Sequence, residues 1–376
     1  MGSAAEVVAA GHICLDITPP FTETGAQAAI VPAGLVFVGP PVVSTGGSVA
    51  NTGLALHRLG VPVRLMGKVG DDLFGRAILD LLRRHGPALA DGMIVSPGEA
   101  SSYTIVLNPP GLDRCFLHCT GTNDTFGPDD VTDARLAGGR LLHFGYPPLM
   151  RRMREQNGAA LAELLGRAKA LGLATSLDMA QPDPNSEAGR LDWPALLARV
   201  LPRVDVFLPN LEETLFMTDR ALLDRLRAEG GAAGVFAKAD RALLRATADR
   251  LLGWGAALVV LKLGDRGLYL KATADRGRLA QVGGGLLPAA VWAGREGLVP
   301  CFRAKVVSTT GAGDTTVAGF LAALLKGLPP DEAMTMAVAV GACSVEQADA
   351  TGGVPGWEAV RRRVAAGWDR LPGLIA

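Results

Sequence analysis

The sequence has no excess of charge of either sign, since lysine plus arginine and aspartate plus glutamate each number 37 among 376 residues. A nucleic-acid-binding protein normally carries a basic surplus, so this balance argues against nucleic acid as a partner. The sequence also lacks an apolar run of the roughly 18 residues that a membrane span needs, and it lacks a signal-peptide pattern. We therefore expect a cytoplasmic protein that acts on a small molecule away from membranes.

Cysteine is scarce, and its five positions are scattered along the chain. An odd, dispersed set fits a reducing compartment better than a disulfide framework. Cys115 and Cys119 have no cluster of other ligand-type residues around them, so we expect no zinc site there. With 49% hydrophobic residues in 376, the chain can bury a large core without disulfides or a structural metal.

Short apolar runs alternate with amphipathic segments through most of the chain, which is typical of βαβ units on a mostly parallel sheet. One of the helical stretches is Ala159–Ala170, with Gly172 as its stop signal. The pattern predicts an α/β protein with a single domain over residues 1–376. The runs expected to form its strands are Val7–Ala10, Val63–Met66, Ala174–Leu177, Val204–Leu208 and Leu258–Leu261.

Two segments, 30–45 and 101–119, break this rhythm with β-like runs punctuated by proline and glycine. The second predicts a hairpin that pairs Thr104–Leu107 with Cys115–His118 around the turn sequence NPPGLD. We interpret both segments as a small antiparallel β lid over a site. Two surface hairpins without a ligand role are the alternative.

The lid is expected to comprise segments of about 17–45 and 99–122. Its exposed strand edges could pair with a second lid, which makes a homodimer through the lid one expected arrangement. The glycine-rich stretch 273–300 is predicted to be a loop insertion into the main domain.

The stretch from Ser308 to Gly327 carries the strongest chemical signal in the sequence. Its apolar residues recur at helical spacing and predict one amphipathic helix that begins at about Gly311–Asp314, directly after a glycine-rich turn. These apolar residues are Val317, Phe320, Leu321, Leu324 and Leu325.

The start of this helix is suited to bind an anion. Its first amides have no intrahelical partners, and Gly311 and Gly313 let a phosphate approach them closely. Asp314 would then stand beside a phosphate, where its carboxylate could take a proton from an attacking hydroxyl. Alternatively, Asp314 only caps the helix and the glycines only make a tight turn.

Thr309-Thr310-Gly311-Ala312-Gly313-Asp314 resembles the second signature of the ribokinase-like (PfkB) carbohydrate kinases. Four more segments resemble other family motifs, in family order, and together they span residues 11 to about 355. The resemblance implies a three-layer sandwich with a mostly parallel central sheet and a small β lid. The four segments are Gly46–Asn51, Gly67–Gly75, Asn210–Glu213 and Lys262–Gly267.

The resemblance also implies roles for individual residues. Asp314 would be the general base, and Gly311, Ala312 and Gly313 would provide an anion hole for the phosphoryl group. Glu213, with Asn210, would organise Mg²⁺ around the ATP phosphates. The remaining nucleotide-binding residues implied are Lys262, Gly264, Gly267 and Thr310.

The substrate would be held beneath the lid by Asp16, Gly46, Gly47, Asn51 and Tyr146, according to the same resemblance. Plainer alternatives exist for two of the site residues. Asp16 could only form a turn before the two prolines that follow, and Glu213 could be a solvated acid at a helix start that Asn210 caps.

The sequence departs from ribokinase at three positions. Ser48 replaces a lysine after the two glycines, and Ser308 replaces the aspartate that often opens the second signature, which puts the monovalent-cation site of some relatives in doubt. Tyr146 stands where ribokinase has glutamate. Substrate contacts are therefore expected to differ, and ribose is not the default substrate.

The sequence thus predicts an ATP-dependent kinase that phosphorylates a hydroxyl of a sugar or sugar acid, with ATP and Mg²⁺ as cofactors. A nucleoside kinase of the same fold and a non-catalytic binding relative are the alternatives. A Rossmann dehydrogenase ranks last, because no G-x-G-x-x-G motif follows the first strand.

Overall fold

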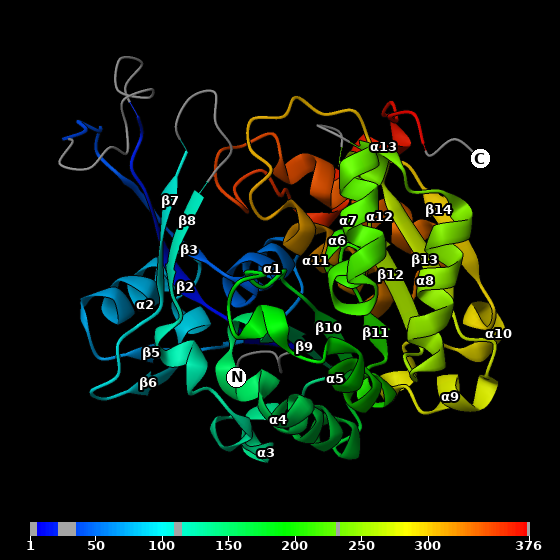
Figure 1. Cartoon of the computed structure of the whole chain (residues 1–376), viewed down its shortest axis with the longest axis horizontal. Coiled ribbons are helices and arrows are strands. Elements are labelled where there is room, and N and C mark those ends of the chain that lie inside the picture. The colour runs from blue at the N-terminus through cyan, green and yellow to red at the C-terminus, as the bar shows by residue number, and fades with distance from the viewer. Residues whose placement is uncertain (1–5, 22–34, 109–114, 231–233, 374–376) are drawn as a thin grey trace.

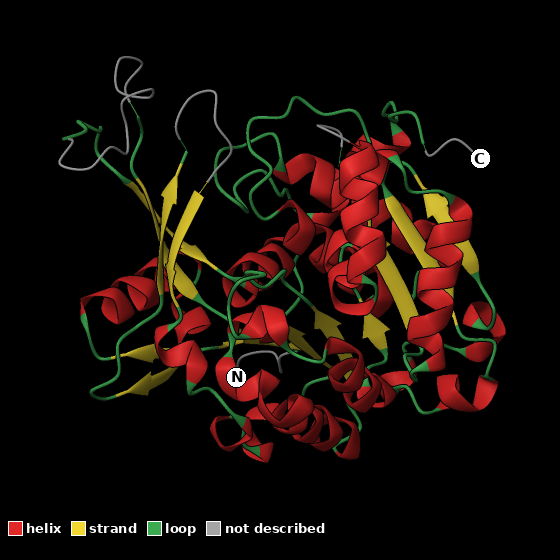
Figure 2. Ribbon diagram, viewed as in Figure 1, coloured by secondary structure: helices red, strands yellow, loops and turns green. Residues whose placement is uncertain are grey.

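The structure is a computed structural model that describes residues 6–21, 35–108, 115–230 and 234–373. A large sheet with helices on both of its faces occupies most of the molecule, and a smaller sheet stands beside it (Figures 1 and 2). This arrangement is the α/β sandwich with a mostly parallel central sheet that the sequence predicts.

The large sheet has eight strands in the order β14-β13-β12-β11-β10-β9-β1-β4. All pairings from β12 to β4 are parallel, whereas β13 pairs antiparallel with both β12 and β14. Strand β1 (VVAAG) is apolar without alternation because the sheet is covered on both faces. The strands are β1 (Val7–Gly11), β4 (Val63–Met66), β9 (Leu141–Gly145), β10 (Ala174–Asp178), β11 (Val206–Phe207), β12 (Leu258–Lys262), β13 (Leu268–Ala272) and β14 (Glu296–Val299).

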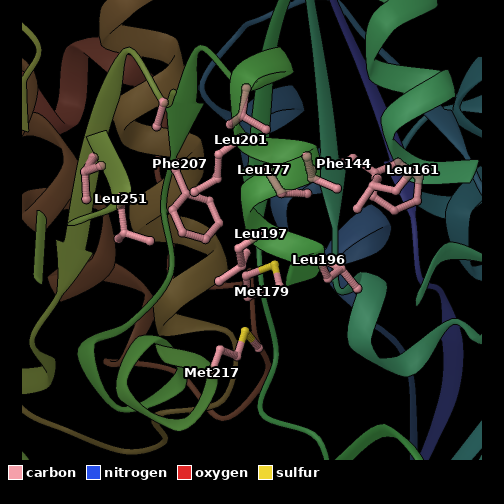
Figure 3. Packing of buried hydrophobic residues seen from close by; sticks show 14 of the residues in the cluster. Phe144, Leu161, Leu177, Met179, Leu196, Leu197, Leu201, Phe207, Met217 and Leu251 are labelled. Carbon is pink, nitrogen blue, oxygen red and sulfur yellow. The ribbon is translucent and has the colours of Figure 1, made fainter. Parts of the chain in front are cut away.

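Two helical layers cover this sheet, and each has its own apolar core. Successive residues of a strand point to opposite faces. Val8 accordingly packs with the helices of one layer, α4 to α8, while Val7 packs with α1 and α9 to α13 on the other. Figure 3 shows part of the first core, where Phe144, Leu177 and Phe207 meet side chains from α4 and α5. The helices are α1 (Ser48–Arg58), α2 (Leu73–His85), α3 (Asp133–Leu136), α4 (Arg151–Ala170), α5 (Trp193–Val200), α6 (Leu211–Thr218), α7 (Arg220–Gly230), α8 (Arg241–Gly253), α9 (Arg276–Ala280), α10 (Ala289–Trp292), α11 (Ala312–Leu325), α12 (Pro330–Ser344) and α13 (Trp357–Ala365).

The small sheet has the order β3-β2-β7-β8 and packs against α2. Its strands are β3 (Val42–Gly46), β2 (Cys14–Thr18), β7 (Tyr103–Leu107) and β8 (Cys115–Cys119). The predicted hairpin is present as the antiparallel pair β7 and β8. The other antiparallel pair is β2 with β3, whereas β2 and β7 are parallel because long connections join them.

The expected β-like segment 30–45 is a strand only from Val42 onward, since residues 35–41 are mostly irregular. Its first residues, 30–34, lie outside the described residues, as does most of the predicted turn after Asn108. A further two-stranded parallel sheet, β5 (Lys68–Gly70) with β6 (Ile94–Ser96), lies beside the small sheet.

The glycine-rich stretch 273–300 is not the loop insertion that we expect from its composition. It contains α9, α10 and the edge strand β14, which pairs with β13. Leu279 and Trp292 are both buried in the core of that face, so a few apolar anchors order the segment despite its glycines. Strand β11 is also shorter than the predicted run 204–208.

The helix expected at Ala159–Ala170 forms the second part of α4, and a non-helical kink at Glu155–Gly158 separates it from the first turn. No helix within the described part of the chain is long and apolar enough to cross a membrane.

Candidate active site

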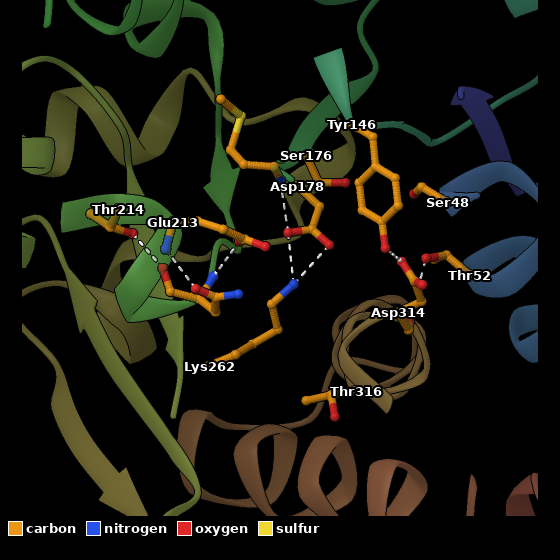
Figure 4. Close-up of polar contacts among 12 residues, drawn as sticks. Ser48, Thr52, Tyr146, Ser176, Asp178, Glu213, Thr214, Lys262, Asp314 and Thr316 are labelled. Carbon is orange, nitrogen blue, oxygen red and sulfur yellow. Dashed lines mark hydrogen bonds and ion pairs between the residues drawn. The ribbon is translucent and has the colours of Figure 1, made fainter. Parts of the chain in front are cut away.

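The candidate site lies where β10 and β12 end and α11 begins (Figure 4). Asp178 is the last residue of β10 and Lys262 is the last residue of β12. The carboxyl ends of parallel strands meet at one edge of a sheet, and this edge is the usual place for a ligand in open α/β folds. Asp314, in the first turn of α11, lies at the same edge.

Asp314 is 2% exposed, and both of its carboxylate oxygens are engaged. The Tyr146 hydroxyl donates a hydrogen bond of 2.7 Å to Oδ1, and the Asn51 amide donates one of 2.9 Å to Oδ2. Tyr146 follows β9 in a left-handed conformation with φ of 64°, and Asn51 lies in α1. Two segments far from Asp314 in the sequence therefore fix the orientation of its carboxylate.

Burial raises the pKa of Asp314, while Lys262 and the hydrogen bonds from Tyr146 and Asn51 oppose that rise. A carboxylate oxygen has more than one acceptor position, so either oxygen of Asp314 can accept a further hydrogen bond from a bound hydroxyl. A buried, hydrogen-bonded carboxylate with a raised pKa has the properties of a general base that operates near neutral pH.

Lys262 forms the central ion pair of the site. Its ammonium group lies 2.7 Å from each carboxylate oxygen of Asp178, and the side chains are 12% and 0% exposed respectively. Burial opposes the charge on Lys262, but Asp178 and Glu213 raise its pKa, so it stays protonated. A permanent buried cation at this edge is suited to bind phosphate oxygens.

Glu213 and Asn210 cap the start of α6 reciprocally. The Asn210 side chain accepts from the Glu213 amide at 2.7 Å, and the Glu213 carboxylate accepts from the Asn210 amide at 2.8 Å. This capping box is the structural alternative for Asn210, and it uses only one of the two carboxylate oxygens of Glu213. Glu213 faces the site beside Lys262 and Asp178 (Figure 4).

The site holds more carboxylates than cations. Burial raises the pKa of Glu213 to about 8 and that of Asp178 to about 6, although Lys262 opposes both shifts. Carboxylate oxygens are the ligands that Mg²⁺ prefers, and a bound Mg²⁺ would favour the charged forms of both acids. No group of three histidine, cysteine, aspartate or glutamate residues in the described part of the chain could hold a metal alone. The residues therefore fit a Mg²⁺ that takes its other ligands from water and phosphate.

The predicted anion hole coincides with the start of α11. Gly311, the N-cap, has φ of 72°, and Ala312 and Gly313 begin the helix. A Cβ atom added to Gly313 would lie 3.6 Å from the Lys262 ammonium, so the helix start and this cation face the same space. Thr310 precedes the turn, where its amide donates to the Ser308 hydroxyl.

Gly264 and Gly267 flank a short turn after β12, and both have positive φ. For Gly267 the reason is structural, because an added Cβ atom would lie 1.9 Å from the Val299 carbonyl oxygen of β14. Gly264 has more space, since its nearest neighbour is the Phe236 ring at 3.6 Å. The structure thus gives Gly267 a packing role in addition to the implied nucleotide-binding role.

The residues expected to bind the substrate lie at the junction of the small sheet and α1. Asp16, on β2, lies so close to Gly46 that an added Cβ atom there would be 2.1 Å from its carboxylate. Gly47 is the N-cap of α1 with φ of 86°, and its missing side chain makes room for the His12 ring. The alternative interpretation of Asp16 as a turn residue is wrong, since Asp16 lies in the middle of β2 and accepts a hydrogen bond from the Cys14 thiol.

Several residues of this site escaped the sequence analysis. Asp178 could have been found, because it is an acid that ends a predicted parallel strand. His12 and His118 come together only through the contact between the loop after β1 and strand β8, with a distance of 3.3 Å between their Nε2 atoms. No local pattern indicates this pair.

Comparisons with known proteins identify the family to which the chain is similar. The model of the pfkB family of carbohydrate kinases matches residues 6–357. An uncharacterised sugar kinase of Archaeoglobus fulgidus is 27% identical over 304 residues, which cover 80% of this chain and 98% of that protein. The 2-dehydro-3-deoxygluconokinase of Thermoproteus tenax is 25% identical over 84% of each chain. The structure of Arabidopsis thaliana ribokinase complexed with ribose and ATP has a TM-score of 0.69 at 18% identity, and the match covers 96% of this chain and 98% of that one.

Proposed function

This chain belongs to the pfkB family of carbohydrate kinases, and we propose that it transfers the γ-phosphate of ATP to a hydroxyl of a sugar or sugar-like substrate with Asp314 as the general base. The observation that carries the proposal is the position of Asp314. Its carboxylate is buried at the start of α11, beside the helix amides and within the electrostatic reach of Lys262. The proton acceptor, Asp314, therefore lies beside the groups that would bind phosphate, which are the helix amides and Lys262, and phosphoryl transfer requires this arrangement.

The residues divide the chemistry between them. Asp314 accepts the proton of the attacking hydroxyl, and Tyr146 and Asn51 hold its carboxylate in position. The amides of Gly311, Ala312 and Gly313 would stabilise the charge on the transferring phosphoryl group. Preorganised donors of this kind stabilise a transition state without reorganisation during the reaction.

The nucleotide would lie on the other side of Asp314. Lys262 donates to its phosphate oxygens, and Gly264 and Thr310 line its binding site. Glu213 would help to hold Mg²⁺ together with the phosphates, and the ion would supply positive charge to the phosphate groups. Asn210 keeps Glu213 oriented through the capping box.

We also propose that the chain is a single domain and that the small sheet acts as a lid on the substrate. Its strands carry Asp16 and reach the first turn of α1 through Gly46, so closure would exclude water that otherwise competes as acceptor. Phe37, Val42 and Phe116 are exposed around this sheet, which supports a homodimer through the lid. All five cysteines are free, which supports a cytoplasmic location.

The test is ATP consumption with Mg²⁺ across a panel of sugars, sugar acids, inositols and nucleosides, measured as ADP release. A response to one compound, with a phosphorylated product confirmed by mass spectrometry, supports the proposal. A response to nucleosides alone would replace it with a nucleoside kinase. Silence across the panel while ATP still binds would favour a non-catalytic relative.

A further inference from the structure

Two polar side chains lie inside the large sheet, where strands covered on both faces are normally apolar. His143 on β9 and Ser176 on β10 stand directly opposite each other in the parallel pair, and both are 0% exposed. Two positions before them, Leu141 and Ala174 pack in the core on the side of α1 and α11. Both polar side chains therefore point to that same face of the sheet, directly beneath the candidate site. The proposed phosphoryl transfer uses neither of them directly.

These two residues form a hydrogen-bonded chain with Ser48 at the start of α1. Nδ1 of His143 lies 2.9 Å from the Ser176 hydroxyl, and Nε2 lies 3.2 Å from the Ser48 hydroxyl. Ser48 fits against β9 because Gly145 has no side chain, since a Cβ atom added there would lie 1.8 Å from the Ser48 hydroxyl oxygen. One imidazole thus joins two strands of the sheet to the first turn of α1.

The imidazole of His143 is uncharged in this chain. Burial lowers its pKa to about 3, and the positive charge of Lys262 acts in the same direction. A neutral ring has one donor and one acceptor nitrogen, and a serine hydroxyl can play either part, so both ring nitrogens can be satisfied together. A buried polar network whose members are all bonded is rigid, whereas loss of one partner leaves the other polar group unpaired.

The first turns of α1 connect this network to the proposed base. Asn51 and Thr52 lie three and four residues after Ser48, so the three side chains share one face of the helix. The Asn51 amide donates to the Asp314 carboxylate at 2.9 Å, and the Thr52 hydroxyl donates to the Asp314 backbone carbonyl at 3.4 Å. One end of this helix face is therefore bonded to His143, and the other end is bonded to Asp314 (Figure 4).

We propose that His143 is a positioning residue: through the Ser48 hydroxyl it fixes the face of α1 that orients the Asp314 carboxylate. The inference rests on the proposed function and deepens it, because it assigns the support of the same base. It also assigns a function to Ser48, one of the positions at which the sequence departs from ribokinase. A small misplacement of a catalytic group costs a large factor in rate, so a support of this kind affects turnover as well as stability.

The first experiment breaks the chain at one end at a time. In His143→Asn the amide takes the place of Nδ1 and keeps only the bond to Ser176, whereas in His143→Gln it takes the place of Nε2 and keeps only the bond to Ser48. We expect His143→Asn to lower kcat/KM for the acceptor by about 10-fold, with KM for ATP unchanged. His143→Gln should retain most of the activity. Equal losses in the two variants, or no loss in His143→Asn, would overturn the inference.

A pH profile separates positioning from plain destabilisation. The bond from Asn51 favours the charged form of Asp314, so its loosening in His143→Asn or Ser48→Ala should raise the pKa of Asp314. The acidic limb of kcat/KM should then move to higher pH by about 0.5 unit, part of what a hydrogen bond to a charged group contributes. Both variants leave unchanged the other titratable groups that face Asp314, which are Tyr146, Lys262, Asp178 and Glu213.

Thr175→Val is the matched control for this profile. Thr175 is a buried hydroxyl on β10 beside Ser176, but it points to the opposite face of the sheet, where it donates to the Arg203 carbonyl at 2.6 Å. Its loss should lower the unfolding temperature and leave the acidic limb in place. A shift as large as that in Ser48→Ala would show that general destabilisation, not positioning, moves the limb.

Ser48→Ala reaches the same bond from its other end. It removes a single hydroxyl, so it carries the test if His143→Asn does not fold. Where both variants fold, the double variant should be no slower than the slower single variant, because both substitutions break one bond. Additive losses of kcat/KM would contradict a shared role for the two side chains.

Carboxyl NMR separates this inference from the proposed function. With ¹³C-labelled aspartate, the Asp314 signal is the one that Asp314→Asn removes, and its titration requires no turnover. A higher pKa of Asp314 in Ser48→Ala than in the wild type supports the inference, and an unchanged pKa rejects it. A wild-type chain that shows this difference but phosphorylates no compound of the panel would reject the kinase proposal alone.

Discussion

The hydroxyl of Tyr146 donates a 2.7 Å hydrogen bond to the carboxylate of Asp314, across 168 residues of sequence. Tyr146 holds a left-handed backbone conformation to do so, which residues other than glycine adopt at a cost in free energy. Its pKa lies well above 10 because of burial and the neighbouring Asp314, so it acts as a donor and not as an anion. The resemblance implies a substrate-binding role for Tyr146, and in the structure its hydroxyl is bound to Asp314.

The first prediction concerns this hydrogen bond. Tyr146→Phe removes a donor to Asp314 and should raise the pKa of Asp314 further, since the bond favours the charged form. The acidic limb of the kcat/KM profile should therefore move to higher pH by about one unit. One pKa unit corresponds to about 1.4 kcal/mol, which is close to the free energy of a hydrogen bond to a charged group. Tyr103→Phe on β7 is the control, and an equal shift there would argue against a specific role.

The second prediction concerns the base. Asp314→Asn keeps the size of the side chain but cannot accept the proton, so kcat should fall by about 10² to 10⁴-fold, while ATP and sugar still bind. Asp331→Asn, at an exposed acid in the first turn of α12, is the matched control. Near-normal turnover in Asp314→Asn would falsify the assignment of the base.

The third prediction concerns the buried ion pair. Lys262→Met leaves Asp178 without its cation and should destabilise the fold by about 3 to 5 kcal/mol, with loss of ATP affinity. Adding Asp178→Asn removes the unpaired charge and should recover part of the stability but not the ATP affinity. Urea unfolding of the single and double variants measures this coupling.

The exposed pair Arg83 and Asp80 on α2 provides the control for this cycle, and its two substitutions should act independently. Purely additive effects of Lys262→Met and Asp178→Asn would show that the two side chains are not coupled.

The fourth prediction separates two glycines that are two residues apart. Gly313→Ala adds a Cβ atom toward Lys262 at 3.6 Å without a backbone penalty, so it should raise KM for ATP and leave stability nearly unchanged. Gly311→Ala adds a Cβ atom 2.5 Å from that of Ala350 at positive φ, so it should cost about 1 to 2 kcal/mol of backbone strain alone. Thermal unfolding and ATP kinetics of both variants test the distinction, and the reverse pattern would contradict it.

The fifth prediction concerns pH. Burial raises the pKa of Glu213 from 4.5 to about 8, so between these values the folded chain binds more protons than the unfolded chain. Its contribution to stability is complete below pH 4.5 and is lost as the pH rises toward 8, with a slope of at most ~1.4 kcal/mol per pH unit. In magnesium-free buffer, Glu213→Gln should flatten this decline, whereas Glu212→Gln on the same turn of α6 should not.

The sequence indicated most of the fold because its signals are local. The apolar run of β1, the helix after Gly311 and the hairpin of β7 and β8 each depend on residues close together in the chain. The composition of segment 273–300 predicts a loop, but the segment is ordered because Leu279 and Trp292 are buried in the core of the large sheet, which composition does not reveal.

By itself, the sequence determined the α/β class, the start of α11 after a glycine-rich turn and the presence of Asp314 there, since each follows from the spacing of neighbouring residues. Only the tertiary structure decided what surrounds that carboxylate. Tyr146 and Asn51 reach it from two other elements. Asp178, at the end of β10, pairs with Lys262, at the end of β12, and His12 contacts His118 where the large and small sheets meet. These contacts join residues that are tens to hundreds of positions apart, and packing, not local pattern, brings them together.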